Sequence, residues 1–431
     1  MKRMRMTVAA LAGILAAASV TAATIAKGPG GRLYFAQRVN DAGIMKVQLQ
    51  SVAISNDWGY GTIQTHGLVT DNYDNSGWPQ HSEIGIHPTI ETSGGLGYGT
   101  LVMGLFYNNT PASTRGAQVL DVLRLTPSEG ALSTTLLGDG RDHQANWKDT
   151  DDGLFARPDS EGLFTGGSGR IVTGLRSAAT GRLGISINYN EGGTADITDN
   201  DADYHATTFT GSGGQMIENH ILGNRMYVSD TYYMAGPTYG GVYYFERQSG
   251  GSYTQSPYWR STVGTNGWDG LLYRGTMRFA VGRVTVNYGG PVQRDAIYWN
   301  SGFDGSYRSG IAMAVDVNGN GVADDPGEYS LMYWTNIVST ARFAHNVGDL
   351  AFVTDAKTGN SFLLVADNGG TMTVLELNAD GTWAGKTLPR GGVADDYKKV
   401  FYPGNAGPNG WWFTFDAYVP PPPKGSVVLL R

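Results

Sequence analysis

A short motif, a glycine followed by a strand of alternating apolar residues and then a polar turn, returns six times along this chain. The copies begin at Gly43, Gly116, Gly193, Gly241, Gly310 and Gly370. Successive glycines are separated by 73, 77, 48, 69 and 60 residues. Units of this size, repeated along a chain, predict a ring of similar small β-sheets.

The clearest single unit runs from residue 348 to residue 383. The strands expected in it are Leu350–Thr354, Ser361–Ala366 and Thr371–Leu377. Asp367–Gly370 contains the Asn and Gly residues that tight hairpin turns need, because both tolerate a positive φ. A second unit, at 178–194, has nearly the same spacing between its turn residues. Three strands in a meander make up most of one propeller blade.

The general pattern, with a strand ending in Tyr-Val or Leu-Tyr, a loop, and then Gly-x-apolar-x-apolar, resembles the blades of secreted bacterial β-propellers. The resemblance implies an all-β fold with one β-propeller domain over residues 23–431. Six blades are the first expectation and seven the next. We also expect strands from both chain ends to complete one blade. Gly425–Leu430 would be the C-terminal contribution, after an extended polyproline run at Pro420–Pro423.

The first 22 residues have the features of an export signal. Lys2, Arg3 and Arg5 form a charged start, and small residues follow at the expected cleavage point, Val20–Ala22. The apolar stretch between them, Thr7–Val20, is about 14 residues long, whereas a membrane span needs about 20. The prediction is therefore a cleaved leader and a secreted protein without a membrane span, in preference to a retained anchor.

Composition excludes several classes of function. The chain has no cysteine, which removes disulfide scaffolds, thiol catalysis and iron–sulfur centres. The net charge is −7, and loss of Lys2, Arg3 and Arg5 with the leader makes it −10. An acidic chain without a basic stripe is not expected to bind nucleic acid. Hydrolase elbows, zinc-protease motifs and phosphate-binding glycine loops are absent from the sequence, so no organic cofactor is predicted.

The strongest local chemistry is a candidate calcium loop that starts at residue 316. Its oxygen-bearing side chains at positions 1, 3, 5 and 9 are Asp316, Asn318, Asn320 and Asp324, and position 6 is Gly321. This spacing matches the first part of an EF-hand-type loop, in which alternating oxygens converge on one cation. Position 12 is Gly327, and Glu328 follows one place later, so the last ligand departs from the pattern. The alternative is a polar hairpin loop without an ion.

Two further acidic segments, 199–203 and 149–153, are interpreted as solvated loops in preference to additional cation sites. The calcium predicted at 316–324 is a structural ion, not a catalytic one.

Candidate catalytic residues come from expected loops. His81, His143, Tyr232, Tyr233 and Arg141 are the residue types that propeller polysaccharide lyases use. In such enzymes a His or Tyr removes the proton beside a uronic acid carboxylate, and an Arg or a cation neutralises that carboxylate. His66 is expected in a similar loop. The alternative is that all of these are ordinary loop residues, since no spacing shows that they meet.

Aromatic residues give the other functional indication. Rings in expected loops can stack on sugar faces or can pack between blades. Those considered are Tyr232, Tyr233, Tyr258, Trp259, Trp268, Trp299, Trp411 and Trp412. The sequence thus favours a secreted propeller that recognises an extracellular polysaccharide and, in its enzymatic version, cleaves it by β-elimination. The alternative is a non-catalytic surface or matrix protein that mediates protein–protein contacts.

Overall fold

The computed structural model describes about half of the chain, mostly its strands. The described residues are 25–41, 44–58, 62–69, 86–90, 101–108, 118–128, 130–138, 155–159, 170–177, 182–188, 205–209, 215–231, 241–260, 279–301, 309–335, 350–366, 372–388 and 414–419. All regular elements among them are β-strands. The all-β prediction is therefore confirmed for this part of the chain.

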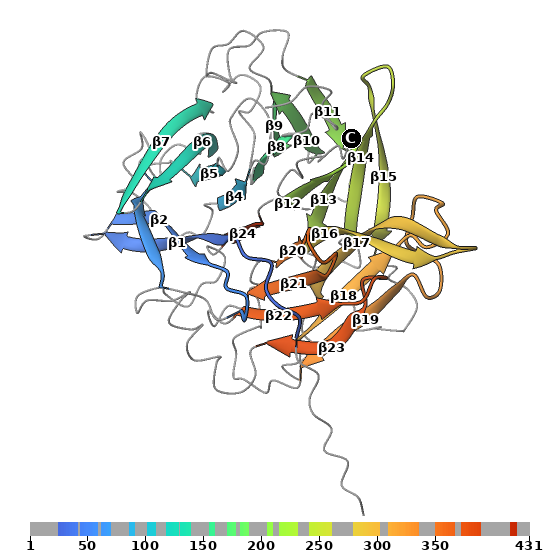
Figure 1. The fold of residues 1–431 in the computed structure, drawn as a ribbon. Coiled ribbons are helices and arrows are strands. Elements are labelled where there is room, and N and C mark those ends of the chain that lie inside the picture. Colours follow the sequence, from blue (N-terminus) through green and yellow to red (C-terminus); the bar gives the residue numbers. More distant parts are fainter. Residues whose placement is uncertain are drawn as a thin grey trace, which may run out of the picture.

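The described strands form six antiparallel sheets of four strands each (Figure 1). Sheet I contains β24 Thr414–Tyr418, β1 Arg32–Asp41, β2 Ile44–Ala53 and β3 Gln64–Leu68. Sheet II contains β4 Ile86–Ile90, β5 Leu101–Asn108, β6 Gln118–Ser128 and β7 Ala131–Gly138. Sheet III contains β8 Phe155–Asp159, β9 Arg170–Ser177, β10 Arg182–Asn188 and β11 His205–Phe209. Sheet IV contains β12 Gln215–Leu222, β13 Arg225–Thr231, β14 Gly241–Arg247 and β15 Tyr253–Arg260. Sheet V contains β16 Phe279–Asn287, β17 Pro291–Ser301, β18 Ser309–Val315 and β19 Tyr329–Thr335. Sheet VI contains β20 Leu350–Thr354, β21 Ser361–Ala366, β22 Met372–Leu377 and β23 Trp383–Leu388.

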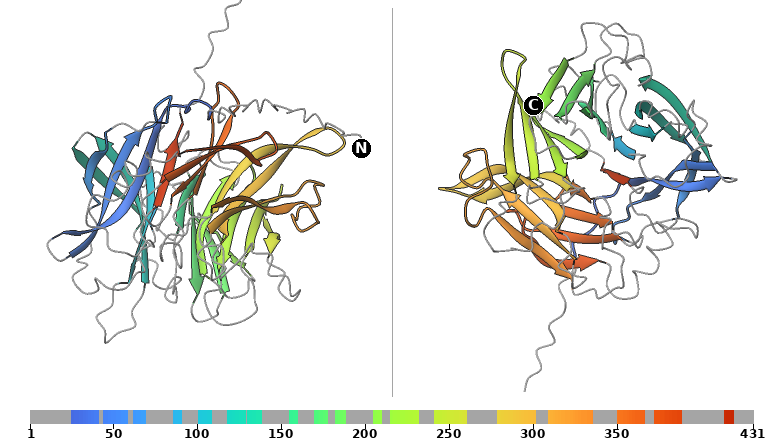
Figure 2. Two further views of the ribbon diagram at one scale, coloured as in Figure 1. Left: turned by 90° about the horizontal axis from the view of Figure 1, so that it is seen from below. Right: turned by 180° about the vertical axis from the view of Figure 1, so that it is seen from behind.

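Within each sheet the strands are hydrogen-bonded in chain order, except that β24 joins sheet I ahead of β1. The first strand of each sheet contacts the first strand of the next: β24 contacts β4, β4 contacts β8, β8 contacts β12, β12 contacts β16, β16 contacts β20, and β20 contacts β24. In Figures 1 and 2 the sheets accordingly follow one another around the molecule, and the last sheet lies beside the first.

The cores lie between neighbouring sheets, and in several strands both faces are buried, as in β14, where Gly241 to Phe245 are buried in succession. In β16, Ala280, Val284 and Val286 are buried, whereas Arg283 and Asn287, which point to the other face, are exposed. One apolar cluster joins sheets V and VI, a second joins IV and V, a third joins I and II, and a fourth joins VI and I. Each unit therefore needs its neighbours in order to bury its apolar faces.

Five of the six glycine-led segments occupy equivalent positions. They form or immediately precede the third strands of their sheets, which are β2, β6, β14, β18 and β22. The prediction that the copy at Gly193 begins the third strand of sheet III is wrong. That strand is β10, which follows Gly181, and Gly193 lies outside the described residues. With Gly181 in place of Gly193, the second and third intervals become 65 and 60 residues, which is more even.

Strands from both ends of the described chain share sheet I, as expected. The C-terminal strand is β24, whose pairing with β1 runs from Arg32 opposite Tyr418 to Ala36 opposite Thr414. The C-terminal strand expected from the sequence, 425–430, lies outside the described residues. The pairing position is thus filled by a segment that precedes the proline run.

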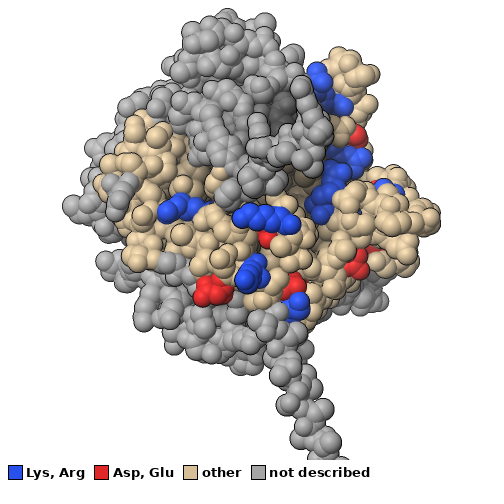
Figure 3. Space-filling view, viewed as in Figure 1, with Lys and Arg blue, Asp and Glu red and all other residues tan. Residues whose placement is uncertain are grey.

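Described charged side chains of both signs are interspersed on the face shown in Figure 3. Among the described residues, no helix is long and apolar enough to cross a membrane.

Candidate functional site

The predicted calcium loop is the connection between β18 and β19, at residues 316–328. Gly319 and Gly321 have φ values of +82° and +95°, a region that favours glycine. Gly321 stands at loop position 6, where the sequence pattern requires a sharp turn. These two positive φ values fold the loop back on its first residue, Asp316.

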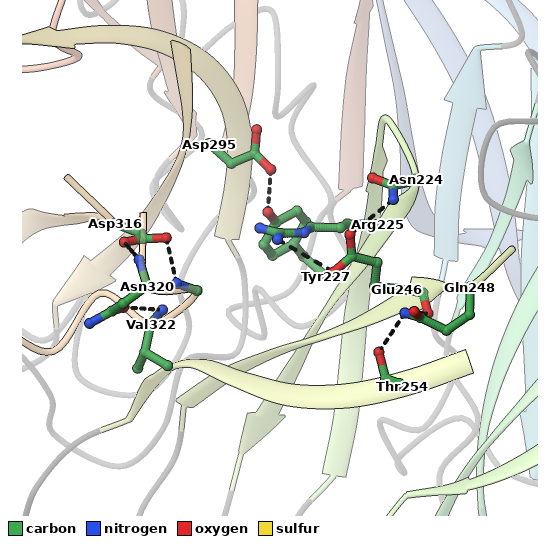
Figure 4. Close-up of polar contacts among 11 residues, drawn as sticks. Asn224, Arg225, Tyr227, Glu246, Gln248, Thr254, Asp295, Asp316, Asn320 and Val322 are labelled. Atoms are coloured by element: carbon green, nitrogen blue, oxygen red, sulfur yellow. Dashed lines mark hydrogen bonds and ion pairs between the residues drawn. The ribbon is translucent and has the colours of Figure 1, made fainter. Parts of the chain in front are cut away.

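The Asp316 carboxylate lies at the centre of this turn. Its Oδ1 accepts hydrogen bonds from the backbone N–H groups of Gly319, at 2.7 Å, and Asn320, at 3.0 Å. Its Oδ2 accepts the N–H of Gly321, at 2.8 Å. The Asn320 side-chain oxygen in turn accepts the N–H of Val322, at 2.8 Å (Figure 4). The loop is therefore preformed by side-chain-to-backbone hydrogen bonds.

Glu328 completes the loop although it stands one position later than the pattern requires. It is 5% exposed. Its Oε1 accepts the N–H groups of Val317 and Asn318, at 2.8 and 3.1 Å, and its Oε2 accepts the N–H of Asp325, at 3.2 Å. One carboxylate oxygen from each of Asp324, Asp325 and Glu328 lies within 4.8 Å of the other two. In the sequence, Glu328 stands one place after the pattern and the last ligand is open, whereas Asp325 was not considered, because the pattern specifies fixed positions.

The loop is also bound to the neighbouring sheet IV through Tyr258 of β15. The Tyr258 hydroxyl accepts the N–H of Asp316, at 3.0 Å, and its backbone oxygen accepts the N–H of Ala323, at 2.7 Å. The same hydroxyl donates to the backbone oxygen of Asp295 in β17. Burial raises the pKa of Tyr258 above its usual value, so this hydroxyl keeps its proton and its donor role.

A second polar cluster lies on the same junction between sheets IV and V (Figure 4). The buried Tyr227 hydroxyl donates to Oδ2 of Asp295, which is 8% exposed. Arg283 Nε lies 2.9 Å from Asp295 Oδ1, close enough for an ion pair but without the angle of a hydrogen bond. Burial, followed by the charge of Asp295, raises the pKa of Tyr227 well above its usual value.

Arg225 and Glu246 extend this cluster on sheet IV. Arg225 Nη2 lies 3.4 Å from Glu246 Oε2, and the guanidinium carbon lies 4.4 Å from the centre of the Tyr244 ring. Sequence reasoning missed the whole cluster, because its members come from four strands with no common motif. Since Tyr227 and Asp295 are buried, the arrangement is that of a junction and not of a substrate site.

The predicted catalytic residues His81, His143, Tyr232, Tyr233 and Arg141 all lie outside the described residues.

His66, expected in a loop, is instead a buried residue of strand β3. Its Nε2 lies 2.6 Å from the Ser51 hydroxyl and its Nδ1 lies 2.7 Å from the backbone oxygen of Ser128 in sheet II. His66 therefore links sheets I and II. The sequence did not indicate this role, because β3 is too short for its alternating pattern to be recognised.

Three of the aromatic candidates for sugar stacking are packed inside the molecule. Tyr258, Trp259 and Trp299 are at most 2% exposed, and the rings of Trp259 and Trp299 lie 4.3 Å apart between sheets IV and V. Packing between sheets is therefore their role. Tyr232, Tyr233, Trp268, Trp411 and Trp412 lie outside the described residues.

The strand order fixes which connections leave from the same end of a sheet. We call the leading end of a sheet the end at which the chain enters its first strand. Because neighbouring strands are antiparallel, the second-to-third connection and the exit from the fourth strand are also at the leading end. The connections 69–85, 139–154 and 232–240 are of these kinds, and they contain all five predicted catalytic residues. The loop 316–328 is a third-to-fourth connection, at the opposite end.

No protein-family model and no curated protein matches this chain. Among solved structures, the chain is similar to the α-L-arabinofuranosidase of Fusarium graminearum, with 11% identity, coverage of 85% of this chain and 93% of that one, and a TM-score of 0.40. It is also similar to the levansucrase of B. megaterium, with 10% identity, coverage of 72% and 86%, and a TM-score of 0.38. A third similar structure is the SapL1 lectin in complex with α-methyl fucoside, with 9% identity, coverage of 84% of this chain and 98% of that one, and a TM-score of 0.39. At these identities and TM-scores the likenesses do not decide the function of this chain.

Proposed function

We propose that this protein is an exported six-bladed β-propeller that binds an extracellular polysaccharide at the leading ends of its sheets. Export rests on the leader at 1–22. The ring rests on the cycle of contacts between first strands, which passes through all six sheets and returns from β20 to β24. In such a ring the loops of every blade converge at the mouth of the central channel, which is where ligands of this fold are bound.

Contacts between neighbouring sheets support a common orientation of their ends. Thr285, near the opposite end of sheet V, donates its N–H to the oxygen of Ala379, in an opposite-end turn of sheet VI, at 2.7 Å. Between sheets I and II, His66 reaches the backbone oxygen of Ser128, the last residue of β6 and thus also at the opposite end. At these two junctions opposite ends meet, which supports leading ends that share one side of the proposed ring.

The observation that carries the proposal is the distribution of tryptophan over the connections. Of the ten tryptophans, four are in strands and one, Trp58, is in an opposite-end connection and 1% exposed. The remaining five are all in leading-end connections: Trp78, Trp147, Trp268, Trp411 and Trp412. All three histidines in connections, His81, His143 and His345, are at the same end. Rings that these connections presented at their own end of the sheets would suit stacking on sugar faces.

We further propose that the protein cleaves its polysaccharide, a uronic acid polymer, by β-elimination. The base, His81, His143, Tyr232 or Tyr233, would take the proton on the carbon beside the carboxylate. The electron pair of that C–H bond would form a new C=C bond as the glycosidic C–O bond breaks, and the leaving oxygen would take a proton from an acid in the site. Arg141 would stabilise the charge that develops on the carboxylate. All five residues belong to sequence segments that join strands at leading ends, and this supports the lyase version.

Calcium is proposed as a structural ion in the loop 316–328. Asp316, Asn318, Asn320 and Asp324 remain the proposed ligands, and the closeness of Asp325 and Glu328 to Asp324 supports their addition. These are hard oxygen donors of the kind calcium prefers. The loop lies at the end of its sheet opposite to the proposed ligand site, which supports a structural role over a catalytic one.

The experiment is a binding screen of the mature chain against neutral and uronic acid polysaccharides, by affinity electrophoresis and calorimetry. Because the net charge of −10 opposes polyanions, the panel includes both kinds. We expect Trp78→Ala and Trp147→Ala each to weaken binding roughly tenfold, which corresponds to about 1.4 kcal/mol. The matched control is Tyr288→Ala, which removes a ring that is 54% exposed in an opposite-end hairpin and should leave affinity unchanged.

The same panel separates the alternatives. New ultraviolet absorbance from unsaturated products, lost in His81→Ala or His143→Ala, would identify the lyase version. Binding without cleavage leaves recognition alone. Absence of binding to every polymer would overturn the proposal in favour of a protein–protein role at the cell surface or in a matrix.

A further inference from the structure

The segment that precedes the first strand, Ile25–Gly31, lies against both the first and the last sheet. On the sheet I side, Gly28 donates its N–H to the oxygen of Asn56, at 2.8 Å, and the oxygen of Gly31 accepts the N–H of Ile54, at 3.0 Å. Ile25 and Ala26 pack against an apolar cluster whose members come from sheets I and VI. The segment therefore bridges the one junction that connects the two ends of the described chain.

The polar attachment to sheet VI is a buried carboxylate. Glu376 of β22 is 8% exposed, and its Oε2 accepts the N–H of Ala26, at 2.5 Å. Its other oxygen, Oε1, lies 2.7 Å from the ammonium of Lys386 on β23. Lys386 compensates the buried charge of Glu376, which leaves the second oxygen available for a backbone donor.

Trp58 holds the segment from the other side. Its indole Nε1 donates to the oxygen of Ala26, at 2.8 Å, and its ring meets Phe362 of sheet VI edge-to-face, with centroids 4.8 Å apart. Trp58 is 1% exposed and is the one non-glycine residue with positive φ in the described part of the chain, at 60°. Such a conformation is costly for a bulky residue and persists only where the surroundings impose it.

The fit of the segment leaves no room at Gly28. A Cβ added there would lie 2.3 Å from the backbone oxygen of Ser55 and 3.2 Å from the Trp58 ring. Lys27, directly before it, is exposed. Lys27 thus faces solvent, whereas Gly28 packs tightly against the turn of sheet I that contains Ser55 and Trp58.

From these contacts we propose that Ile25–Gly31 is an N-terminal latch, a conformational device that fastens sheet VI to sheet I and can release while the sheets stay folded. The latch acts beside the β24–β1 pairing and does not depend on it, because its partners Glu376, Trp58 and Asn56 are not in those strands. Its release loosens one junction, between the last and first sheets, which the apolar cluster and β24 still hold, and leaves the other junctions unchanged. Local opening of this kind, below the free energy of global unfolding, is common for terminal segments.

The test is amide hydrogen exchange combined with tryptic cleavage after Lys27, on the mature chain. In the unsubstituted protein the amides of Ala26 and Gly28 are expected to be protected and Lys27 to resist trypsin. Gly28→Ala should raise exchange at both amides and cleavage at Lys27 by roughly tenfold or more. Gly250→Ala is the matched control, because an added Cβ there meets nothing within 4 Å.

A second pair of variants keeps the test valid if Gly28→Ala does not fold. Glu376→Leu removes the acceptor for Ala26 and should release the latch. Glu376→Gln keeps a side-chain oxygen for Ala26 while it loses the charge, and should retain protection of the Ala26 amide. Exchange should rise in strands β20 to β23 but not in β13 or β14 of sheet IV. Unprotected Ala26 and Gly28 amides in the unsubstituted protein, or an equal rise in all six sheets on latch substitution, would overturn the proposal.

Discussion

At the scale of single residues, the molecule depends on buried tyrosine hydroxyls that cross between sheets. Tyr227 and Tyr258 join sheets IV and V, and the Tyr298 hydroxyl donates to the oxygen of Gly381, linking V and VI. All three are at most 1% exposed. Burial raises the pKa of each above its usual value, because a phenolate would lose its hydration inside the molecule.

This arrangement predicts alkaline destabilisation. In the unfolded chain a tyrosine loses its proton near pH 10, whereas these three keep theirs in the folded state. Their contribution to stability is therefore complete below pH 10 and is lost as the pH rises above it. Each can lower the free energy of unfolding by up to about 1.4 kcal/mol per pH unit.

Denaturant unfolding between neutral pH and pH 11 measures this slope. Tyr258→Phe should make it shallower, while Tyr288→Phe, at an exposed ring, should leave it unchanged. A slope that is the same in all three proteins would contradict the role of the buried hydroxyls.

At the scale of elements, the loop 316–328 is fastened at two points to a strand of another sheet. Tyr258 receives the N–H of Asp316 at its hydroxyl and the N–H of Ala323 at its backbone oxygen. An ion bound by this loop would hold both its own hairpin and the junction of sheets IV and V. Occupancy of the loop and stability of that junction are then linked.

Calcium is accordingly expected to raise the thermal midpoint, by an amount that corresponds to about 2.7 kcal/mol at 100 times the dissociation constant. Asp316→Ala should remove the whole gain. Asp355→Ala is a matched control, because the Asp355 carboxylate also accepts a backbone N–H in an opposite-end turn, from Lys357 at 2.9 Å, but outside the proposed ion site. A midpoint that does not respond to calcium or to a chelator would exclude the ion.

The sequence predicted the all-β fold class and the third strand of most sheets, because the alternation of apolar residues and the placement of glycines are local properties of the chain. It misplaced the third copy, since the turn residues at 190–194 resemble those at 367–371 and hairpin chemistry is shared by many turns. The closing strand was misplaced because pairing with β1 depends on geometry at the other end of the chain. The cluster at Asp295 left no sequence signal, because its contacts with Tyr227 and Arg283 span 68 and 12 residues.

At the scale of the whole molecule, closure between the first and last sheets is the feature that distinguishes a ring from an open row. Two devices meet at this junction. One is β24, which pairs with β1 and contacts β4 and β20. The other is the N-terminal latch, which reaches Glu376. Both ends of the described chain are thus used to hold one junction.

Two truncations test the role of β24 in closure. A chain that ends at Val419 keeps β24 and loses the proline run and the residues after it. It should unfold at the same temperature as the full chain. A chain that ends at residue 413 loses β24 and leaves the N–H and C=O groups of Arg32–Ala36 without their partners on that side. Its midpoint should fall by several degrees, and it should self-associate, because an open strand edge is a template for pairing with another chain.

Thermal unfolding and size-exclusion chromatography of the three mature chains give the comparison. If closure instead used the segment 425–430, the chain ending at Val419 would already show the fall and the self-association. Equal midpoints for all three chains would mean that neither segment is needed for closure, and the latch and the apolar cluster between sheets I and VI would then hold the last sheet to the first.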